Sequence, residues 1–164
     1  MVALFRGRPA TGPIYVMPLD DPVCIFCKII AGTAPSSVVY RDDQVLAFMD
    51  IQPVNPGQVL VVPLQHAAYL SDLNAASGGR MFQVAQTIAA ALRKSSIPCD
   101  GINLFLADGE VATQEVFHTH LHIIPRFDGE GFGLKYGPSN FVRLEREQLD
   151  SAADKVRAVL PHGA

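Results

Sequence analysis

Residues 118–126, with the sequence HTHLHIIPR, alternate between two kinds of side chain and constrain the fold more than any other segment. Histidine occupies positions 118, 120 and 122, and these are three of the five histidines in the chain. Side chains two residues apart in a β-strand point to the same face, so an extended backbone places the three imidazoles together. Thr119, Leu121 and Ile123 then point to the opposite face. The pattern predicts a half-buried strand with a row of histidines on one side.

Three imidazoles in a row can be surface residues, metal ligands or catalytic groups. Cα atoms four residues apart in a strand are roughly 13 Å apart. His118 and His122 therefore cannot easily reach one zinc ion, whose bonds to nitrogen are about 2.0–2.1 Å long. Separate roles for the three rings are the better interpretation. Neutral imidazole is a nucleophile near pH 7, so a central histidine can attack phosphorus while a flanking one stabilises the phosphate charge.

A second pattern, the C-x-x-C pair Cys24 and Cys27, offers a role for one of these histidines. The chain has three cysteines, an odd number that does not suit a disulfide framework. A lone C-x-x-C pair can be redox-active, can simply be buried, or can bind a metal. A closed zinc site needs four ligands, and Cys24, Cys27, His66 and His118 would complete a Cys2His2 set. We therefore expect zinc as a structural cofactor that ties the N-terminal turn to the sheet.

Length and charge indicate a single domain and disfavour nucleic-acid and membrane binding. A chain of 164 residues suits one domain with a real core, and 49% of its residues are hydrophobic. The net charge of -3 and the pI of about 5.9 disfavour nucleic-acid binding, which needs clustered Lys and Arg, but allow a small phosphorylated ligand. No apolar run approaches the roughly 20 residues of a membrane helix, and the N-terminus lacks the pattern of a secretory signal. The sequence indicates a cytoplasmic protein without membrane contact.

Turn signals and hydrophobic periodicity divide the chain into an arm and one domain. Residues 1–22 are rich in proline and predict an extended arm, and residues 23–164 form the domain. Residues 74–95 have apolar side chains at helical spacing and predict one long helix. Short strands joined by turns, with grouped helices, predict an α+β fold with an antiparallel sheet of about five strands and a C-terminal helix. The expected strands are 37–43, 44–51, 58–63, 101–108 and 115–125, and the expected shorter helices are 24–32 and 146–160.

Three longer segments together resemble one family. They are CIFCKIIAG from residue 24, VYRDDQVLAFMDIQPVNPGQVLVVPLQH from residue 39 and GEVATQEVFHTHLHIIPR from residue 109. Over about residues 24–126 the chain resembles the histidine triad (HIT) family, and in particular its bacterial zinc-containing branch. The resemblance implies a HIT-like α+β fold, a homodimer, and nucleotide phosphoramidase or nucleotidyl hydrolase activity on purine nucleotides such as AMP or GMP derivatives.

The resemblance also implies roles for individual residues. His120 matches the nucleophile that attacks the α-phosphate, and His122 matches the residue that holds the phosphate. Gln114 matches a glutamine near the phosphate and the leaving group, and Asp50 matches the acidic residue that accepts from the ribose hydroxyls. Ordinary core packing is an equally good interpretation of each residue in the base pocket. The remaining matches are the apolar base pocket (Phe26, Ile29, Phe48, Ile51, Leu60), the nucleotide-binding loop (Thr113, Glu115) and the zinc ligands (Cys24, Cys27, His66, His118).

Five positions depart from the family pattern. Ala107 stands where asparagine usually contacts the phosphate, Thr113 where glycine is usual, and Glu115 where serine or threonine is common. Gln58 replaces a frequent histidine, and Thr119 replaces an aliphatic residue. These departures leave the nucleophile intact and bear on substrate and rate. They keep two alternatives open: a zinc-stabilised nucleotide-binding protein with little turnover, and a dinucleoside polyphosphate hydrolase or phosphorylase.

Overall fold

The computed structural model describes residues 23–133 and 143–161. The chain divides into two compact units, residues 1–130 and 131–164. The predicted N-terminal arm, residues 1–22, lies outside the described residues. The division into this arm and a single domain over residues 23–164 therefore stays a prediction.

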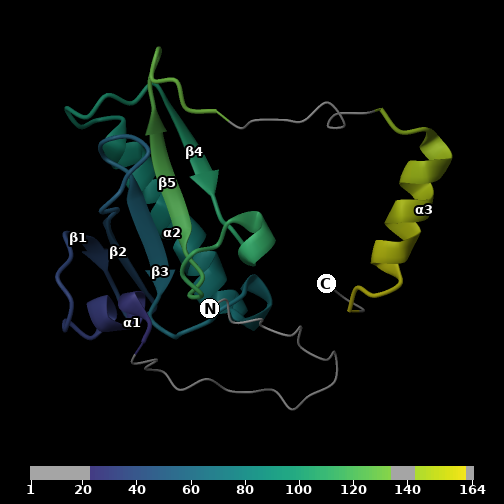
Figure 1. Ribbon diagram of the computed structural model, residues 1–164, viewed down its shortest axis with the longest axis horizontal. Helices are drawn as coiled ribbons and strands as arrows, with labels where there is room; N and C mark the ends of the chain where they lie inside the picture. The colour runs from purple at the N-terminus through teal and green to yellow at the C-terminus, as the bar shows by residue number, and fades with distance from the viewer. Residues whose placement is uncertain (1–22, 134–142, 162–164) are drawn as a thin grey trace, which may run out of the picture. The chain divides into compact units, whose positions relative to one another are not determined.

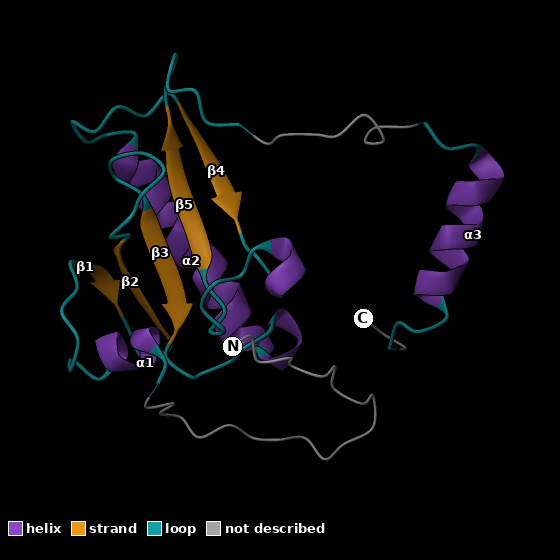
Figure 2. Ribbon diagram, viewed as in Figure 1, coloured by secondary structure: helices purple, strands orange, loops and turns teal. Residues whose placement is uncertain are grey.

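The first unit is built on a five-stranded sheet in which each pair of neighbouring strands is antiparallel (Figure 2). The strand order is β1-β2-β3-β5-β4, so β1 and β4 form the two edges. The predicted α+β fold with an antiparallel sheet is thereby confirmed. The strands are β1 (Val38–Arg41), β2 (Val45–Met49), β3 (Val59–Pro63), β4 (Gly101–Phe105) and β5 (Leu121–Arg126).

Alternation along the strands gives the sheet two different apolar faces. The helix α2 (Ala75–Leu92) packs on one face, and the short helix α1 (Ile25–Ile30) packs on the other (Figure 1). The register pairs Leu60 of β3 with His122 of β5, so His122 lies on the α1 face. The α2 face includes Val45, Ala47, Val59, Val61, Leu121 and Ile123, and the α1 face includes Leu46, Phe48, Leu60 and Val62.

The long helix α2 confirms the prediction from helical spacing. Its buried side chains lie on the side that faces the sheet, and each large one contributes about 1.5–3 kcal/mol by burial. The helix begins where the side chain of Asn74 accepts a hydrogen bond from the backbone N–H of Ser77 at 2.8 Å. It ends at Leu92, and Pro98 follows six residues later, so no helical continuation competes with β4.

The strand that carries the histidines begins later than predicted, at Leu121 and not at Glu115. The backbone N–H of Thr119 donates to the carbonyl oxygen of Ala67 at 2.7 Å, and the Thr119 hydroxyl donates to the same oxygen at 2.9 Å. Ala67 lies in the loop after β3, so this part of the chain contacts a loop and has no strand ladder. His118 and His120 therefore precede β5, although their rings remain on the α1 side, where both contact Phe26.

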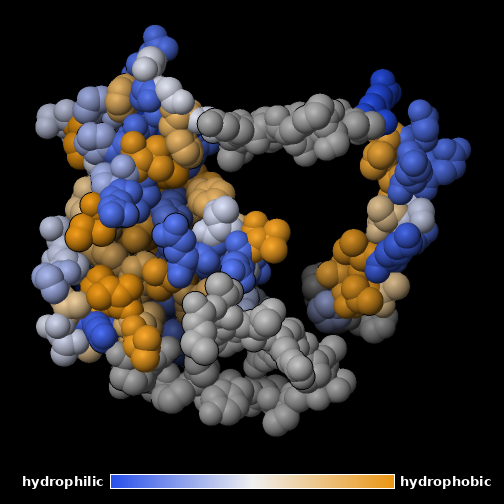
Figure 3. Space-filling model, viewed as in Figure 1, coloured by the Kyte–Doolittle hydropathy of each residue, from blue (hydrophilic) through white to orange (hydrophobic). Residues whose placement is uncertain are grey.

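The second unit contains α3 (Arg146–Arg157), which confirms the predicted C-terminal helix. A capping box begins it: the Glu145 carboxylate accepts from the third helical backbone N–H, and the Gln148 side chain accepts from the N–H of Glu145. Hydrophobic residues lie along one side of α3 and hydrophilic residues along the other (Figure 3). Among the helices that the structure describes, none combines the length and apolarity needed to cross a bilayer.

Candidate active site and metal centre

Four predicted metal ligands converge in the first unit. The ligand atoms of Cys24, Cys27, His66 and His118 all lie within 4.8 Å of one another, and the residues are buried. The sulfur of Cys27 is 3.3 Å from Nδ1 of His66 and 3.6 Å from Nδ1 of His118, and the sulfur of Cys24 is 3.5 Å from the latter nitrogen. Three segments supply the set: the start of α1, the loop after β3 and the residues before β5.

The spacing of these atoms fits a tetrahedral zinc ion. A sulfur and a nitrogen bound to one zinc lie about 3.5 Å apart, from bonds of about 2.3 and 2.0 Å at the tetrahedral angle. The three sulfur–nitrogen distances, 3.3, 3.5 and 3.6 Å, are close to that value. Two thiol groups and two imidazoles are also the donor set that zinc prefers in closed structural sites.

A second contact orients His118 toward this cluster. Its Nε2 lies 2.9 Å from the carbonyl oxygen of Pro63, and a carbonyl oxygen can only accept. Nε2 therefore carries the proton, and Nδ1 presents its lone pair to the cysteines. Burial lowers the pKa of His118 to about 4, so the ring is neutral at pH 7. A neutral imidazole held by a backbone carbonyl is a typical arrangement for a metal ligand.

His120 has the same kind of contact but with the other nitrogen. Its Nδ1 donates to the carbonyl oxygen of His118 at 2.7 Å, so its Nε2 keeps the lone pair. Burial lowers the pKa of His120 below its ordinary value, and the residue is only 6% exposed. The Phe26 ring packs against it with its centroid 5.2 Å away. His120 is thus a neutral, oriented imidazole with one unshared electron pair.

His122 lies in a polar contact that the sequence did not reveal. The side-chain Nε2 of Gln58 is 3.0 Å from Nδ1 of His122 and donates to the Asp50 carboxylate at 2.6 Å. Burial, with the neighbouring His120, lowers the pKa of His122 to about 4. The His120 and His122 rings meet edge to face with centroids 4.9 Å apart. The Phe105 ring, from the edge strand β4, lies 5.8 Å from the His122 ring.

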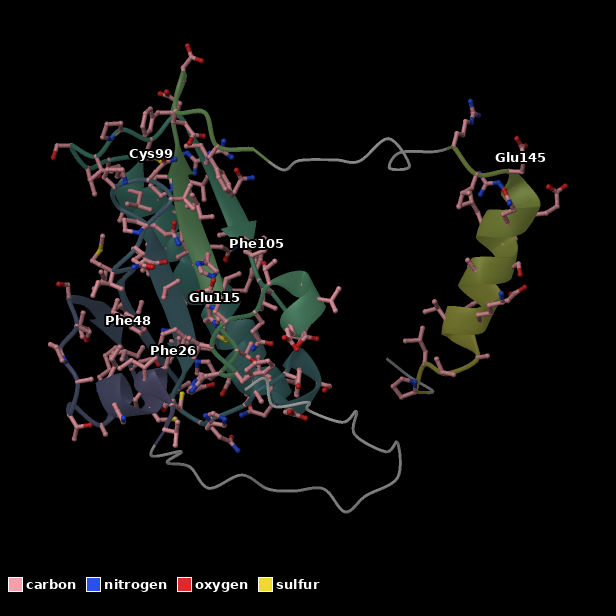
Figure 4. The ribbon with its side chains drawn as sticks, viewed as in Figure 1. Phe26, Phe48, Cys99, Phe105, Glu115 and Glu145 are labelled. Atoms are coloured by element: carbon pink, nitrogen blue, oxygen red, sulfur yellow. The ribbon has the colours of Figure 1, made fainter. Side chains whose placement is uncertain are left out.

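The predicted base pocket falls into two parts. Phe26, Phe48 and Leu60 are buried together in the core on the α1 face, and Ile29 packs against them. The Phe26 and Phe48 rings meet edge to face at 5.5 Å, and Figure 4 shows them side by side near α1. Ile51 is instead 95% exposed, directly after Asp50. The structure therefore brings four of the five residues together and leaves Ile51 at the surface.

The loop that precedes the histidines is held by Gln114. Its side-chain oxygen accepts from the backbone N–H of Gly109 at 2.7 Å, and its side-chain nitrogen donates to the carbonyl oxygens of Ala68 and Val116 at 2.8 and 3.1 Å. Both ends of this buried amide are thus bound to the backbone. Thr113, just before it, adopts a left-handed backbone with φ of 69°.

Two further positions complete this loop region. Ala107 is buried and offers no polar side-chain group. Glu115 is exposed, and its charge favours the protonated form of His120. The role predicted for Gln114 near the phosphate and leaving group, and the places of Thr113 and Glu115 in the nucleotide-binding loop, therefore stay predictions, whereas the Gln114 amide holds the backbone of this loop.

Comparison with known proteins identifies the family to which this chain belongs. The family model "HIT domain" matches residues 31–129. An uncharacterized HIT-like protein of Borreliella burgdorferi is 47% identical over 127 residues, which are 77% of this chain and 90% of that protein. A crystal structure of a HIT family protein from Bacillus subtilis has a TM-score of 0.77 at 36% identity and covers 86% of this chain and 99% of that one. The chain therefore belongs to the histidine triad family.

Other relatives carry names that refer to a metal, a ligand or a reaction. A zinc-bound histidine triad protein from Mycobacterium smegmatis has a TM-score of 0.66 at 34% identity and covers 85% of this chain and 99% of that one. A histidine triad nucleotide-binding protein from Candida albicans has a TM-score of 0.73 at 29% identity, with 82% and 95% covered. An adenylylsulfatase of Arabidopsis thaliana is 37% identical over 63% of this chain and 52% of its own length.

Proposed function

We propose that this protein is a nucleotide hydrolase that uses His120 to attack the α-phosphate of a purine nucleoside phosphoramidate or a related nucleotide. The observation that carries this proposal is the hydrogen bond from Nδ1 of His120 to the carbonyl oxygen of His118. It leaves the Nε2 lone pair available for attack, and burial keeps the ring neutral. Similarity to a nucleotide-binding protein and to an adenylylsulfatase supports a nucleotide as substrate.

The proposed reaction has two displacement steps at phosphorus. First, Nε2 of His120 forms a bond to phosphorus while the bond to the leaving amine breaks. Water then attacks phosphorus, and the bond to His120 breaks to release the nucleoside monophosphate. Over both steps the water supplies a hydroxyl group to phosphorus and one proton to the amine, so His120 returns to its neutral form. A covalent intermediate divides one difficult displacement into two easier ones.

The surrounding residues receive the roles that the family resemblance implies. His122 is proposed to hold the phosphate, and Asp50 to accept from the ribose hydroxyls. One Asp50 oxygen accepts from the backbone of Gln52 and the other from Gln58, and carboxylate oxygens can accept more than one donor each. Ile51 offers an exposed apolar side chain next to Asp50 for a purine base. The other proposed contacts are the base pocket (Phe26, Ile29, Phe48, Leu60) and the loop (Gln114, Thr113, Glu115).

A structural zinc ion is proposed for the cluster of Cys24, Cys27, His66 and His118. Their geometry and donor set fit zinc, and a zinc-bound structural relative supports the assignment. Four protein ligands leave no open position for a substrate, so a bound ion would supply stability alone. It would tie α1 to the segments after β3 and before β5.

A homodimer and a cytoplasmic location complete the proposal. β4 is an edge strand, and its Leu104 and Phe105 side chains are 40% and 39% exposed. An unpaired strand edge with apolar side chains favours pairing with a second copy of the chain. The buried thiol groups of Cys24 and Cys27 suit a reducing compartment. The proposed partners are thus a purine nucleotide and a second copy, without nucleic acid.

The direct test is AMP release from adenosine 5′-phosphoramidate by the wild-type chain and by His120→Ala. We expect turnover by the wild type and none by the variant, with thermal unfolding used to verify that the variant is folded. Equal turnover by both proteins would exclude His120 as the nucleophile and would refute the proposal.

A nucleotide-binding protein with little turnover is the second candidate. Ala107 provides no polar group to the loop, and the Gln114 amide is occupied by three backbone contacts. Both observations reduce the number of side-chain donors available to a phosphate. Tight AMP binding without turnover by the wild-type chain would favour this candidate over the hydrolase.

A further inference from the structure

The side chain of Gln58 is buried and has a partner for every polar atom in its amide plane. It is 2% exposed. Its oxygen accepts from the backbone N–H of Val54 at 2.8 Å. Its nitrogen lies 2.6 Å from an Asp50 carboxylate oxygen and 3.0 Å from Nδ1 of His122. The two hydrogens of the amide nitrogen thus match two different neighbours.

Only one orientation of this amide is chemically consistent. If the oxygen and nitrogen were exchanged, the amide oxygen would face the Asp50 carboxylate and the amide nitrogen would face the Val54 N–H. Both pairings would be repulsive, because carboxylate oxygens only accept and backbone N–H groups only donate. The group that faces Nδ1 of His122 is therefore a donor.

This orientation decides which nitrogen of His122 carries the proton. A neutral imidazole has one N–H and one acceptor nitrogen. Because Gln58 donates to Nδ1, that nitrogen is the acceptor and Nε2 holds the hydrogen. We infer that Gln58 is a positioning residue that holds His122 in the Nε2–H tautomer and so decides which ring nitrogen can donate to a phosphate oxygen.

The result is a pair of neighbouring imidazoles with opposite polarity at Nε2. His120 donates through Nδ1 and keeps a lone pair at Nε2, whereas His122 accepts through Nδ1 and presents a hydrogen at Nε2. Two acceptor nitrogens would leave the phosphate without a donor from His122. Gln58 also joins the proposed ribose-binding Asp50 to the proposed phosphate-binding His122 through one rigid amide.

Gln58 has a second, purely structural contact that any test must separate from this role. The bond from the Val54 N–H, with the bonds from the Asp50 N–H to the Gln58 carbonyl and from the Gln58 N–H to the Asn55 carbonyl, closes the loop between β2 and β3. Loss of this closure would lower stability whatever the tautomer of His122. The ring protonation pattern is a readout that loop closure alone does not change.

Nitrogen-15 NMR of the full-length chain, labelled at its histidine rings, tests the tautomer near neutral pH. Protonated and unprotonated ring nitrogens have well-separated shifts, and His122→Gln identifies the His122 signals by their loss. We expect Nε2 of His122 to be protonated and Nδ1 to be unprotonated. A protonated Nδ1 in the wild type would overturn the inference.

Gln58→Glu then reverses the polarity of the contact. A carboxyl group that shares its proton with the Asp50 carboxylate presents only acceptor oxygens to Nδ1 of His122, so the single hydrogen of the neutral ring moves from Nε2 to Nδ1. We expect Nδ1 to become protonated and kcat for the phosphoramidate to fall about 100-fold or more, as for loss of one oxyanion donor. Gln52→Glu is the matched control, because it adds the same charge to an exposed side chain beside Asp50.

Gln58→Met covers the case in which Gln58→Glu does not fold, because methionine removes the donor without adding charge. His122 should then populate both tautomers. An unchanged tautomer in a folded Gln58 variant would refute the inference. Its kinetic part rests on the proposed function, but the NMR part does not. If the wild type lacks turnover while the tautomer pattern is as expected, the proposed function fails and the role of Gln58 in positioning His122 stands.

Discussion

Thr113 adopts a backbone conformation that threonine disfavours, which makes the effect of one substitution calculable. Its φ is 69°, and no other non-glycine residue in the described ranges has a positive φ. A side chain with a Cβ atom in this region costs roughly 1–2 kcal/mol, because Cβ crowds the neighbouring carbonyl oxygen. Glycine removes this cost but increases the entropy of the unfolded chain, worth about 0.4–1 kcal/mol. Thr113→Gly should therefore raise the free energy of unfolding by about 0.5–1 kcal/mol.

The assay is equilibrium unfolding by urea or by calorimetry on both proteins. For a chain of this size, 1 kcal/mol corresponds to about 2–4 °C in Tm, so the expected increase is about 1–4 °C. The Thr113 side chain is exposed, so its removal sacrifices no burial, and the bond from its backbone N–H to the Glu110 carbonyl is retained.

Ala112→Gly is the matched control for this experiment. Ala112 is the exposed neighbour of Thr113, at the end of the short 3-10 helix Glu110–Ala112, and it has no positive φ to relieve. Glycine at this position should lower stability by roughly 0.5–1 kcal/mol. The reasoning is refuted if Thr113→Gly destabilises the protein as much as Ala112→Gly does.

Three other measurements address the metal centre, a charged contact and a helix cap. Purified protein should contain about one zinc per chain, and Cys27→Ala should lose the metal together with several kcal/mol of stability. Cys99→Ala, which lies outside the cluster, should keep the metal and the stability that it provides. Metal analysis that shows no zinc in the wild type would contradict this. Partial burial raises the pKa of Asp42, but its hydrogen bonds, including that from Arg80, lower it far more, to well below the ordinary 3.8. Its stabilisation is thus complete above pH 3.8 and lost as the pH falls further, so an acid titration of unfolding should become less steep in Asp42→Asn. Asn74→Ala should cost about 1 kcal/mol by removing the cap of α2, and a urea midpoint equal to that of the wild type would show that the cap contributes nothing.

Local patterns were sufficient to predict most elements of the fold. Apolar side chains at helical spacing predicted α2, and short runs of β-forming residues bounded by turn residues predicted the strands, because both signals depend on residues that are close in sequence. The start of β5 was predicted six residues too early. Alternation continues through His118 and His120, but a strand also needs a neighbour to pair with. At Thr119 that neighbour is the loop at Ala67, which no local pattern reveals.

The candidate site shows the same division between local and long-range information. The row of histidines and the C-x-x-C pair were visible, because each is a short motif of chemically distinctive residues. The contact between Gln58 and His122 was not, because it joins positions 64 residues apart and depends on the register of β3 with β5. Phe105 was missed for a related reason: its place opposite His122 follows from the pairing of β4 with β5. Glutamine and phenylalanine are also too common to attract attention on their own.

His118 takes part in the proposed metal centre and in the proposed nucleophilic site through different parts of the same residue. Its imidazole faces Cys24 and Cys27, and its backbone carbonyl accepts from His120. Every amino acid has that carbonyl, so a substitution at position 118 can delete the ligand without deleting the acceptor. The orientation of His120 is therefore robust to a change of side chain and sensitive to a shift of the main chain. Any inhibitor that displaced this peptide group by a fraction of an ångström would act on the proposed nucleophile without contacting its imidazole ring.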